Sequence, residues 1–465
     1  MHRPGFAAAG VLALVLGACA TVGPEYEPPA MELPAAYHAP VPALFERGAR
    51  PGRWWELFGD EQLDGLIERG LDANLELRTA ASRVREARAL ARAVAARGGL
   101  SIDAGGGATA DWLSERRGIS ESGTTRSAEA FLDALWTVDL YGGLERSRQA
   151  ALAEAGRQEA LRREVARLVS AEIARTYIAL RATERRLELT RQSLGLQRKT
   201  LQLVRARVEA GLAPGLDQVR AQAAVAALEA DIGPLRAEIA RLANALAVLL
   251  GAPPGSLTEV TTAHAPIPSV QAGGALGVPL DLLRRRPDVQ AAELLIVART
   301  AEVGVALAEL YPRLTLPGSL SLGYVNAPGQ SAVSFVLASL SALVNAPLYD
   351  GGERRANVEA AEERVAQAAL IYRETVLRAL EEVEAALLAY DGSRRQRDAL
   401  IEVVENNRLA YEQSQQLYRQ GFVTFLDVLD SQRQWNASLQ QLALAERDVS
   451  LAVVALYSSL GGQTE

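Results

Sequence analysis

Two kinds of hydrophobic pattern alternate along the chain, and each of them occurs twice. The first is a heptad within a proline-free stretch from Gly143 to Ala210: Ile173, Leu180, Leu187, Leu194, Leu201 and Val208. A later stretch keeps it in part, with Arg397 interrupting Val383, Tyr390, Val404, Tyr411 and Tyr418. A heptad sustained this long predicts a helix that packs along a coiled-coil seam. The first such helix would be roughly 100 Å long at 1.5 Å per residue.

The second pattern alternates apolar and polar residues with a period of two. It covers residues 100–112, 127–140 and 313–324, and more weakly 334–348. Segments of this length are typical of membrane-barrel strands, although a soluble sheet with one face buried on helices would also alternate. We favour the membrane interpretation because the strands are long and their polar face carries acids. The even-numbered residues Leu132, Ala134, Trp136, Leu320 and Leu322 are then expected to face lipid.

Four strands cannot close a barrel, and unpaired strand edges are not tolerated in hydrocarbon. A membrane location therefore requires several copies of the chain. Two copies would give eight strands, whose side chains fill the interior, and three would give twelve, wide enough for a channel.

The chain is an internal duplication with an offset of 210 residues. "RVEAGLAPGLDQV" (207–219) aligns with "LYRQGFVTFLDVL" (417–429), so that Gly211 matches Gly421 and Asp217 matches Asp427. We expect a first repeat at 60–252, a linker at 253–278 and a second repeat at 279–462. Within the repeats, strands are expected at about 100–141 and 313–348, and helical hairpins with tips at about 211–217 and 421–427.

The N-terminus indicates export. Residues 1–18 have a basic start at Arg3 and an apolar run that ends in small residues, which is typical of a signal peptide. Leu16, Gly17, Ala18 and Cys19 resemble a bacterial lipobox, so we expect Cys19, the only cysteine, to carry a covalent lipid. Ala20 follows it instead of the aspartate typical of inner-membrane retention, which favours the outer membrane. Residues 19–59 would form a lipid-anchored N-terminal segment.

Composition narrows the function further. A net charge of −7 without a basic cluster argues against nucleic acid as a partner. Three histidines and one cysteine leave little for a metal site, and no nucleophile elbow, phosphate loop or dinucleotide loop accompanies the acids. We therefore expect no enzyme activity and no cofactor other than the lipid on Cys19.

Three stretches together resemble the outer membrane factors of bacterial tripartite efflux systems, the TolC-like family, in its lipoprotein (NodT-like) branch. They are residues 53–89, residues 281–324 and "RQGFVTFLDVLDSQR" (419–433). The resemblance implies a mixed α and β membrane protein that forms a homotrimer, with a twelve-stranded β-barrel continuing into a twelve-helix periplasmic α-barrel. It also implies an equatorial region and docking onto a periplasmic adaptor and an inner membrane pump. Efflux of small molecules follows from the family alone.

The two hairpin tips carry the candidate contact residues. Gly211 and Gly421 suit chain reversal in the left-handed conformation. Their apolar neighbours Leu212, Phe422 and Val423 are expected to be exposed and to contact the adaptor.

A candidate gate follows the second tip. Asp217 and Asp427 both suit a helix start, where an acid caps the helix or faces its positive dipole. Asp430 and Arg433 have no such explanation, because the first repeat has Arg220 and Ala223 at these places. Leu426, Asp430 and Arg433 share one helix face, with Asp427 beside it, and in a trimer they would form rings that constrict the periplasmic end. These four positions match the family's gate residues; the alternative is an Asp430–Arg433 pair on one exposed helix, worth a few tenths of a kcal/mol.

One rival function remains plausible at this point. A lipid-anchored periplasmic coiled-coil adaptor or scaffold would share the anchor and the long hairpins. Such an adaptor should carry a compact β-rich module beside one hairpin, whereas here alternating strands recur in each half. The duplication therefore favours a channel.

Overall fold

The computed structural model describes residues 21–42, 53–113, 123–257, 265–270 and 285–462. The chain forms two compact units. The first, here called the strand unit, comprises Met1–Ala30, Arg83–Glu159 and Ala291–Tyr372. The second, the hairpin unit, comprises Met31–Ser82, Ala160–Gln290 and Arg373–Glu465. The signal peptide, Cys19 and most of the 253–278 linker lie outside the described residues.

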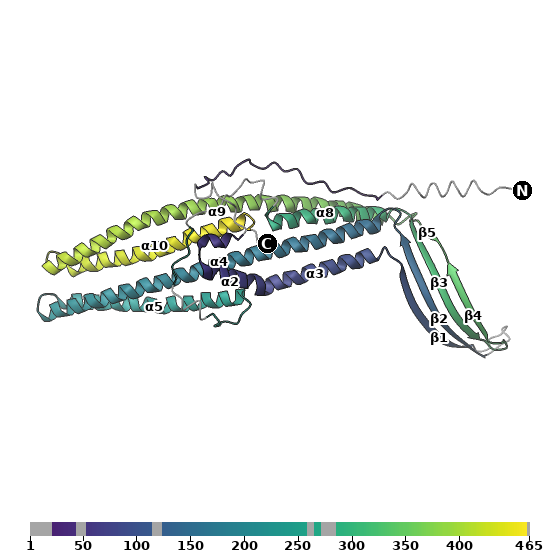
Figure 1. Cartoon of the computed structure of the whole chain (residues 1–465), viewed down its shortest axis with the longest axis horizontal. Helices are drawn as coiled ribbons and strands as arrows, with labels where there is room; N and C mark the ends of the chain where they lie inside the picture. Colours follow the sequence, from purple (N-terminus) through teal and green to yellow (C-terminus); the bar gives the residue numbers. More distant parts are fainter. Residues whose placement is uncertain (1–20, 43–52, 114–122, 258–264, 271–284, 463–465) are drawn as a thin grey trace. The chain divides into compact units, whose positions relative to one another are not determined.

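The two long helices that the heptads predict are present. They are α4 (Gly143–Glu209) and α9 (Glu353–Gln420), and each turns back into a helix of 35 residues, α5 (Gly215–Leu249) and α10 (Phe425–Ser459) (Figure 1). The shorter helices are η2 (Trp54–Phe58), α2 (Glu61–Ala73), α3 (Leu75–Ala96) and α8 (Pro287–Ala308). The heptad residues of α4 from Ile173 to Leu201 are buried, as a packing seam requires. Within the described ranges, no helix is long and apolar enough to span a bilayer.

The strand unit contains one antiparallel sheet. Its strands are β1 (Ser101–Leu113), β2 (Gly123–Val138), β3 (Arg313–Asn326), β4 (Val333–Leu340) and the short β5 (Leu343–Asn345). The order is β1-β2-β3-β4, with β5 also pairing with β3. In the described part of the chain, β1 and β4 therefore leave their outer edges without a partner strand.

The fourth alternating segment forms two strands instead of the single one that its sequence predicts. β4 and β5 share one register against β3, since Gly318 pairs with Leu340 and Thr315 with Leu343. Between these pairs lies Pro317, whose carbonyl accepts from the Ser341 N–H at 2.9 Å. A proline has no N–H to return the bond, so the ladder is interrupted at this point.

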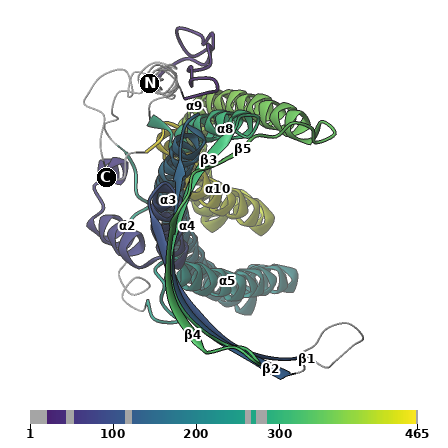
Figure 2. The same cartoon turned by 90° about the vertical axis from the view of Figure 1, so that its right-hand side faces the viewer.

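The two faces of the sheet follow residue parity. Leu132 lies opposite Leu320 and Ala130 opposite Leu322, which confirms that the even-numbered residues share a face. The sheet is strongly curved (Figure 2). Ser321 is only 6% exposed whereas its neighbour Leu322 is 57% exposed. Because side chains on a concave face converge and cover one another, the odd-numbered face is the concave one.

The concave face is less polar than its sequence predicts. Phe131 lies opposite Gly105, and Phe335 opposite Gly323, with each ring placed over its glycine. The rings fill the space that a side chain on the glycine would occupy, which is a known way to support glycine in a strand. These apolar residues pack within the sheet face itself.

The duplication is repeated in the contacts that end the return helices. The Asn74 side chain donates to the Leu249 carbonyl at 2.8 Å, and Arg286 donates to the Ser459 carbonyl at 2.9 Å. The donors are 212 residues apart and the acceptors 210. Arg286 is buried and also pairs with Glu382 at 2.6 Å. The residues just before α3 and α8 therefore satisfy the carbonyls that end α5 and α10.

Candidate functional site

Both hairpin tips have the same backbone geometry. Gly211 and Gly421 end the long helices with φ of 71° and 85°. The Leu212 N–H donates to the Arg207 carbonyl at 2.8 Å, and the Phe422 N–H donates to the Leu417 carbonyl at 3.0 Å. This is the Schellman arrangement, which requires a left-handed residue and therefore favours glycine. Leu212 and Phe422 come next in the chain and are 68% and 75% exposed.

Val423 differs from the expectation that it would be exposed beside Phe422. Its side chain is half-buried and packs against a hydrophobic cluster that includes Tyr418, Phe425 and Leu429. The chain changes direction between the two residues, so that one points outward and the next points back onto the helices. Phe422 and Leu212 are thus the exposed apolar side chains that directly follow the two turn glycines.

The first turn of α10 is closed by Asp427. Its carboxylate accepts from the Thr424 N–H at 2.8 Å and from the Thr424 hydroxyl at 2.6 Å. These bonds to Thr424 hold the pKa of Asp427 below its usual value. Asp427 itself is exposed. It therefore caps the helix start and still presents its charge to solvent.

The first-repeat counterpart behaves differently. Asp217 is buried, and its nearest cation is Arg220, on the same helix, at 3.9 Å. The α5 N-cap is Pro214, without a side-chain capping bond. The two equivalent acids therefore have different environments, although both lie in the first turn of their helices.

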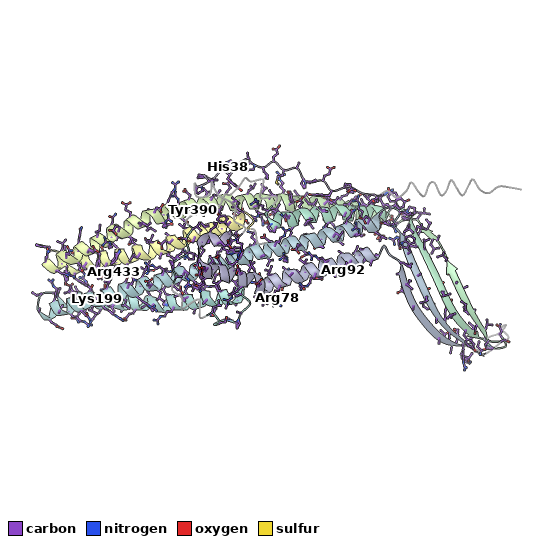
Figure 3. All side chains as sticks on the ribbon, viewed as in Figure 1. His38, Arg78, Arg92, Lys199, Tyr390 and Arg433 are labelled. Atoms are coloured by element: carbon purple, nitrogen blue, oxygen red, sulfur yellow. The ribbon has the colours of Figure 1, made fainter. Side chains whose placement is uncertain are left out.

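The four proposed gate residues lie together on one exposed face of α10. Leu426, Asp427, Asp430 and Arg433 are all exposed, whereas Val428 and Leu429 between them are buried. Asp430 accepts a hydrogen bond from the Gln434 side chain at 2.9 Å. Among the described residues neither Asp430 nor Arg433 forms an ion pair, so the alternative of a pair within one helix is not what the structure shows. Figure 3 labels Arg433 on α10 and Lys199 on α4, in the tip-side half of the hairpins.

The buried side of α10 packs against α4 along a regular antiparallel seam. Ser193 donates to the Asn436 side chain at 2.8 Å, and Gln440 donates to Thr190 at 3.2 Å. Toward the tips the seam becomes apolar, in a cluster that contains Leu201, Val204, Phe425 and Val428. The exposed gate face is thereby held in a fixed orientation by the opposite face of the same helix.

One contact between the hairpins was not predicted from the sequence. The Arg207 guanidinium of α4 lies over the Tyr418 ring of α9, 4.6 Å from its centroid, and donates to the Tyr418 carbonyl at 3.0 Å. A cation over a ring and a charged donor on a helix-end carbonyl are both stabilising. The contact joins the last turns of the two long helices, one from each repeat.

The first described N-terminal residues lie at the junction between strand and helix in the strand unit. The Val22 N–H donates to the Tyr141 carbonyl at 3.0 Å, and Arg146 of α4 donates to the Val22 and Gly23 carbonyls. The Tyr141 and Tyr311 rings stack at 4.5 Å at the same junction. Cys19 itself lies outside the described residues, but the chain resumes two residues later beside the strand ends.

The described residues combine a curved sheet with two free edges and two long helical hairpins, which is the architecture of a class of membrane channel proteins. A family model described as "Outer membrane efflux protein" matches residues 66–252 and 278–462. The chain belongs to this family. It is an outer membrane efflux channel that extends into the periplasm, as its resemblance to the TolC-like family implies.

Particular relatives support the assignment over almost the full length. The chain is 33% identical over 467 residues to the pyoverdine export outer membrane protein OpmQ of Pseudomonas putida, covering 97% of this chain and 96% of OpmQ. It is 30% identical over 462 residues to nodulation protein T of Rhizobium leguminosarum bv. viciae, covering 98% of this chain and 93% of that protein. The solved outer-membrane channel OprN superposes with a TM-score of 0.84 at 32% identity, covering 95% of this chain and 99% of that one.

These findings decide between the alternatives left open by the sequence. The mixed α and β membrane fold and the channel function are confirmed, and the lipoprotein branch fits the similarity to nodulation protein T. Strands from both repeats of the chain form one sheet, and the chain belongs to a family of outer membrane efflux proteins. The alternative function, a periplasmic adaptor or scaffold, is therefore rejected. The family consists of efflux channels and not of enzymes.

Proposed function

We propose that three copies of this chain form one channel. Their strands would close a twelve-stranded barrel in the outer membrane, and their helices would form a twelve-helix tunnel in the periplasm. The observation that carries this proposal is the curved sheet, whose β1 and β4 edges have no partner strand in the described ranges, because a bilayer does not tolerate such edges. The concave face, with Asp103, Asp133 and Ser319 in one cross-strand row, would then line a wet lumen.

The channel would serve a tripartite efflux system. An inner membrane pump would deliver small molecules, and a periplasmic adaptor would join the pump to the hairpin tips. OpmQ, a relative at 33% identity, is a pyoverdine export protein by name, which supports small-molecule export as the substrate class.

The exposed face of α10 would be the periplasmic gate. In a trimer, Leu426, Asp427, Asp430 and Arg433 would each form a ring of three. Two features support this role: the face is exposed, and Asp430 and Arg433 have no ion-pair partner among the described residues of their own protomer. Carboxylate and guanidinium rings that converge on an axis attract each other across protomers and narrow the opening.

Conductance in planar bilayers tests the gate. The double variant Asp430→Ala, Arg433→Ala should raise resting conductance severalfold, because the ion pairs between protomers are lost. Arg220→Ala is the matched control at the equivalent place of the first repeat and should leave conductance unchanged. Wild-type conductance in the double variant would contradict the gate.

The tips would be the docking points for the adaptor. Leu212 and Phe422 present large apolar surface next to rigid turns, and exposed aromatic side chains are frequent contact residues in interfaces. Gly211 and Gly421 shape the turns, while the half-buried Val423 would support Phe422 from behind. Phe422→Asp should abolish crosslinking to the adaptor while the trimer still elutes at its normal volume in gel filtration. Full crosslinking and export in this variant would rule out docking at this tip.

We also propose that Cys19 is the mature N-terminus and carries a lipid. The short distance in sequence from Cys19 to Val22, which is bound beside the strand ends, would place the lipid near the membrane surface. No other cofactor is proposed.

A further inference from the structure

One cavity in the hairpin unit has no role in the channel function described above. Its volume is about 910 Å³. It is walled by α4, α5, α9 and α10 and by a short segment of the linker, Ala265–Ser269, here called the strap. The Ser450 hydroxyl of α10 donates to the Pro268 carbonyl and fixes the strap in place.

The cavity has apolar walls and a charged interior. Leu187, Ile239, Ile267, Ile401 and Val449 supply the apolar surface. The charged side chains are arginines and glutamates from all four helices. Such a combination of apolar lining and a few convergent polar groups is typical of small-molecule sites, whose volumes are about 300–1,000 Å³.

Several of these charges are already neutralised. Arg185 pairs with Glu188 at 2.7 Å, and Arg397 pairs with Asp398 at 2.5 Å, each along its own helix. Glu446 is half-buried, and burial raises its pKa while Arg185 and Arg397 nearby oppose that shift. These groups therefore balance one another without a ligand.

Two guanidinium groups remain. Among the described residues, Arg191 of α4 and Arg236 of α5 line the cavity without an ion pair or a side-chain hydrogen bond. Both residues keep part of their surface exposed to solvent, so their guanidinium groups are accessible to a ligand. Guanidinium groups bind carboxylates and phosphates with two parallel hydrogen bonds. The strap belongs to the linker between the repeats, so it is not part of the duplicated unit.

We propose that this cavity binds an amphiphilic anion, a single carboxylate or similar acid group on an apolar body. Arg191 and Arg236 hold the acid group, and the walls around Ile239 and Ile401 cover the body. The bound molecule joins both hairpins and the strap. All the lining residues belong to one chain, and none of them is a gate residue.

Titration calorimetry on the full-length protein in phosphatidylcholine nanodiscs tests the site. The probes are octanoate, a fatty acid, and 2-naphthoate, an aromatic carboxylate, with 2-naphthamide as the uncharged analogue. At least one acid should bind once per chain and about tenfold more tightly than the amide. Preference for octanoate would identify a lipid-derived ligand, and preference for 2-naphthoate a small aromatic acid.

Variants locate the binding. The double variant Arg191→Ala, Arg236→Ala should weaken acid binding about tenfold. Arg205→Ala is the control, since Arg205 is an exposed arginine of α4 outside the cavity, and it should bind like the wild type. Equal binding of acid and amide by the wild type, or undiminished acid binding by the double variant, would overturn the proposal. If the double variant does not assemble, the comparison of acid with amide on the wild type still decides.

Discussion

Gly421 ends α9 with φ of 85°, whereas Gly392 lies inside the same helix with nothing within 4 Å of the position a Cβ would occupy. A side chain is costly in the left-handed conformation, by about 1–2 kcal/mol. In a helix interior the balance reverses, because alanine restricts the unfolded chain and favours the helix by roughly 0.5–1 kcal/mol. Replacing glycine by alanine is therefore expected to destabilise the protein at Gly421 and to stabilise it at Gly392.

This contrast gives a prediction at the scale of single residues. Gly421→Ala should destabilise the second tip by about 1 kcal/mol, and Gly392→Ala should stabilise the middle of α9 by about 0.5 kcal/mol. Hydrogen–deuterium exchange of the peptides that contain each site measures both effects. Exchange should become faster around residues 417–425 in the first variant and slower around residue 392 in the second. Exchange that changes in the same direction at both sites would contradict the assignment of Gly421 as the left-handed cap.

Local contacts of the candidate site could be predicted from the sequence, and contacts between repeats could not. The spacing of Thr424 and Asp427 indicates a helix start, and the structure shows the corresponding hydrogen bonds. The Arg207–Tyr418 contact joins residues 211 apart, and no sequence pattern relates them. Val423 was expected to be exposed because the sequence does not specify in which direction each tip residue points.

At the scale of elements, two adjacent residues of β3 test which face of the sheet contacts lipid. Leu320 lies on the even-numbered convex face opposite Leu132, and Ser319 lies on the concave face opposite Asp133. Leu320→Arg would place a charge in hydrocarbon, at a cost of about 2–4 kcal/mol at mid-bilayer. Ser319→Arg would instead place it in the lumen beside a carboxylate.

We therefore expect Leu320→Arg to reduce the amount of assembled trimer, and Ser319→Arg to reduce it much less. Unheated gel electrophoresis of outer membrane fractions measures both. The two substitutions are adjacent in sequence and introduce the same side chain, so each is the control for the other. Equal losses would show that the two faces are assigned incorrectly.

The alternation of residues predicted the strands and their faces because both depend on local spacing. It did not predict the interruption between β4 and β5, because the cause lies in the partner strand, where Pro317 lacks a donor. The same applies to Phe131 and Phe335, which lie on the concave face because glycines in neighbouring strands leave room for their rings. These features depend on pairing register, which the sequence does not specify.

At the scale of the whole molecule, two devices would hold the protein in the membrane: the barrel and the lipid on Cys19. The barrel buries far more apolar surface than one acylated residue does. Stable lipid anchoring usually needs more than one chain. The lipid would therefore be an addition to an already stable insertion.

Intact-mass analysis of the mature protein should show an acylated chain that begins at Cys19. Cys19→Ala with signal cleavage retained should still yield trimers in the outer membrane fraction. A free thiol at the N-terminus of the wild type would exclude lipidation. Loss of trimers in the alanine variant would show that the lipid is needed for assembly.

Family membership could be predicted from three stretches in order, and the trimer could be proposed from four strands that cannot close. The cavity beneath the strap could not be predicted from the sequence, because the residues that line it lie on four different helices and the strap. The heptads predict that α4 and α9 are long, but not which helix lies beside which.

The matching contacts of Asn74 with Leu249 and of Arg286 with Ser459 bear on how the two repeats arose. Each repeat fastens its own return helix, so a single-repeat ancestor could have been a self-contained subunit that assembled as six identical copies. In such a ring, any mutation that shut one hairpin would have shut all six. Fusion of two copies into one chain would lower the symmetry to threefold and would let the two hairpins of a chain differ in sequence. The opposite charges at the equivalent positions Arg220 and Asp430 are a difference that only a fused chain allows.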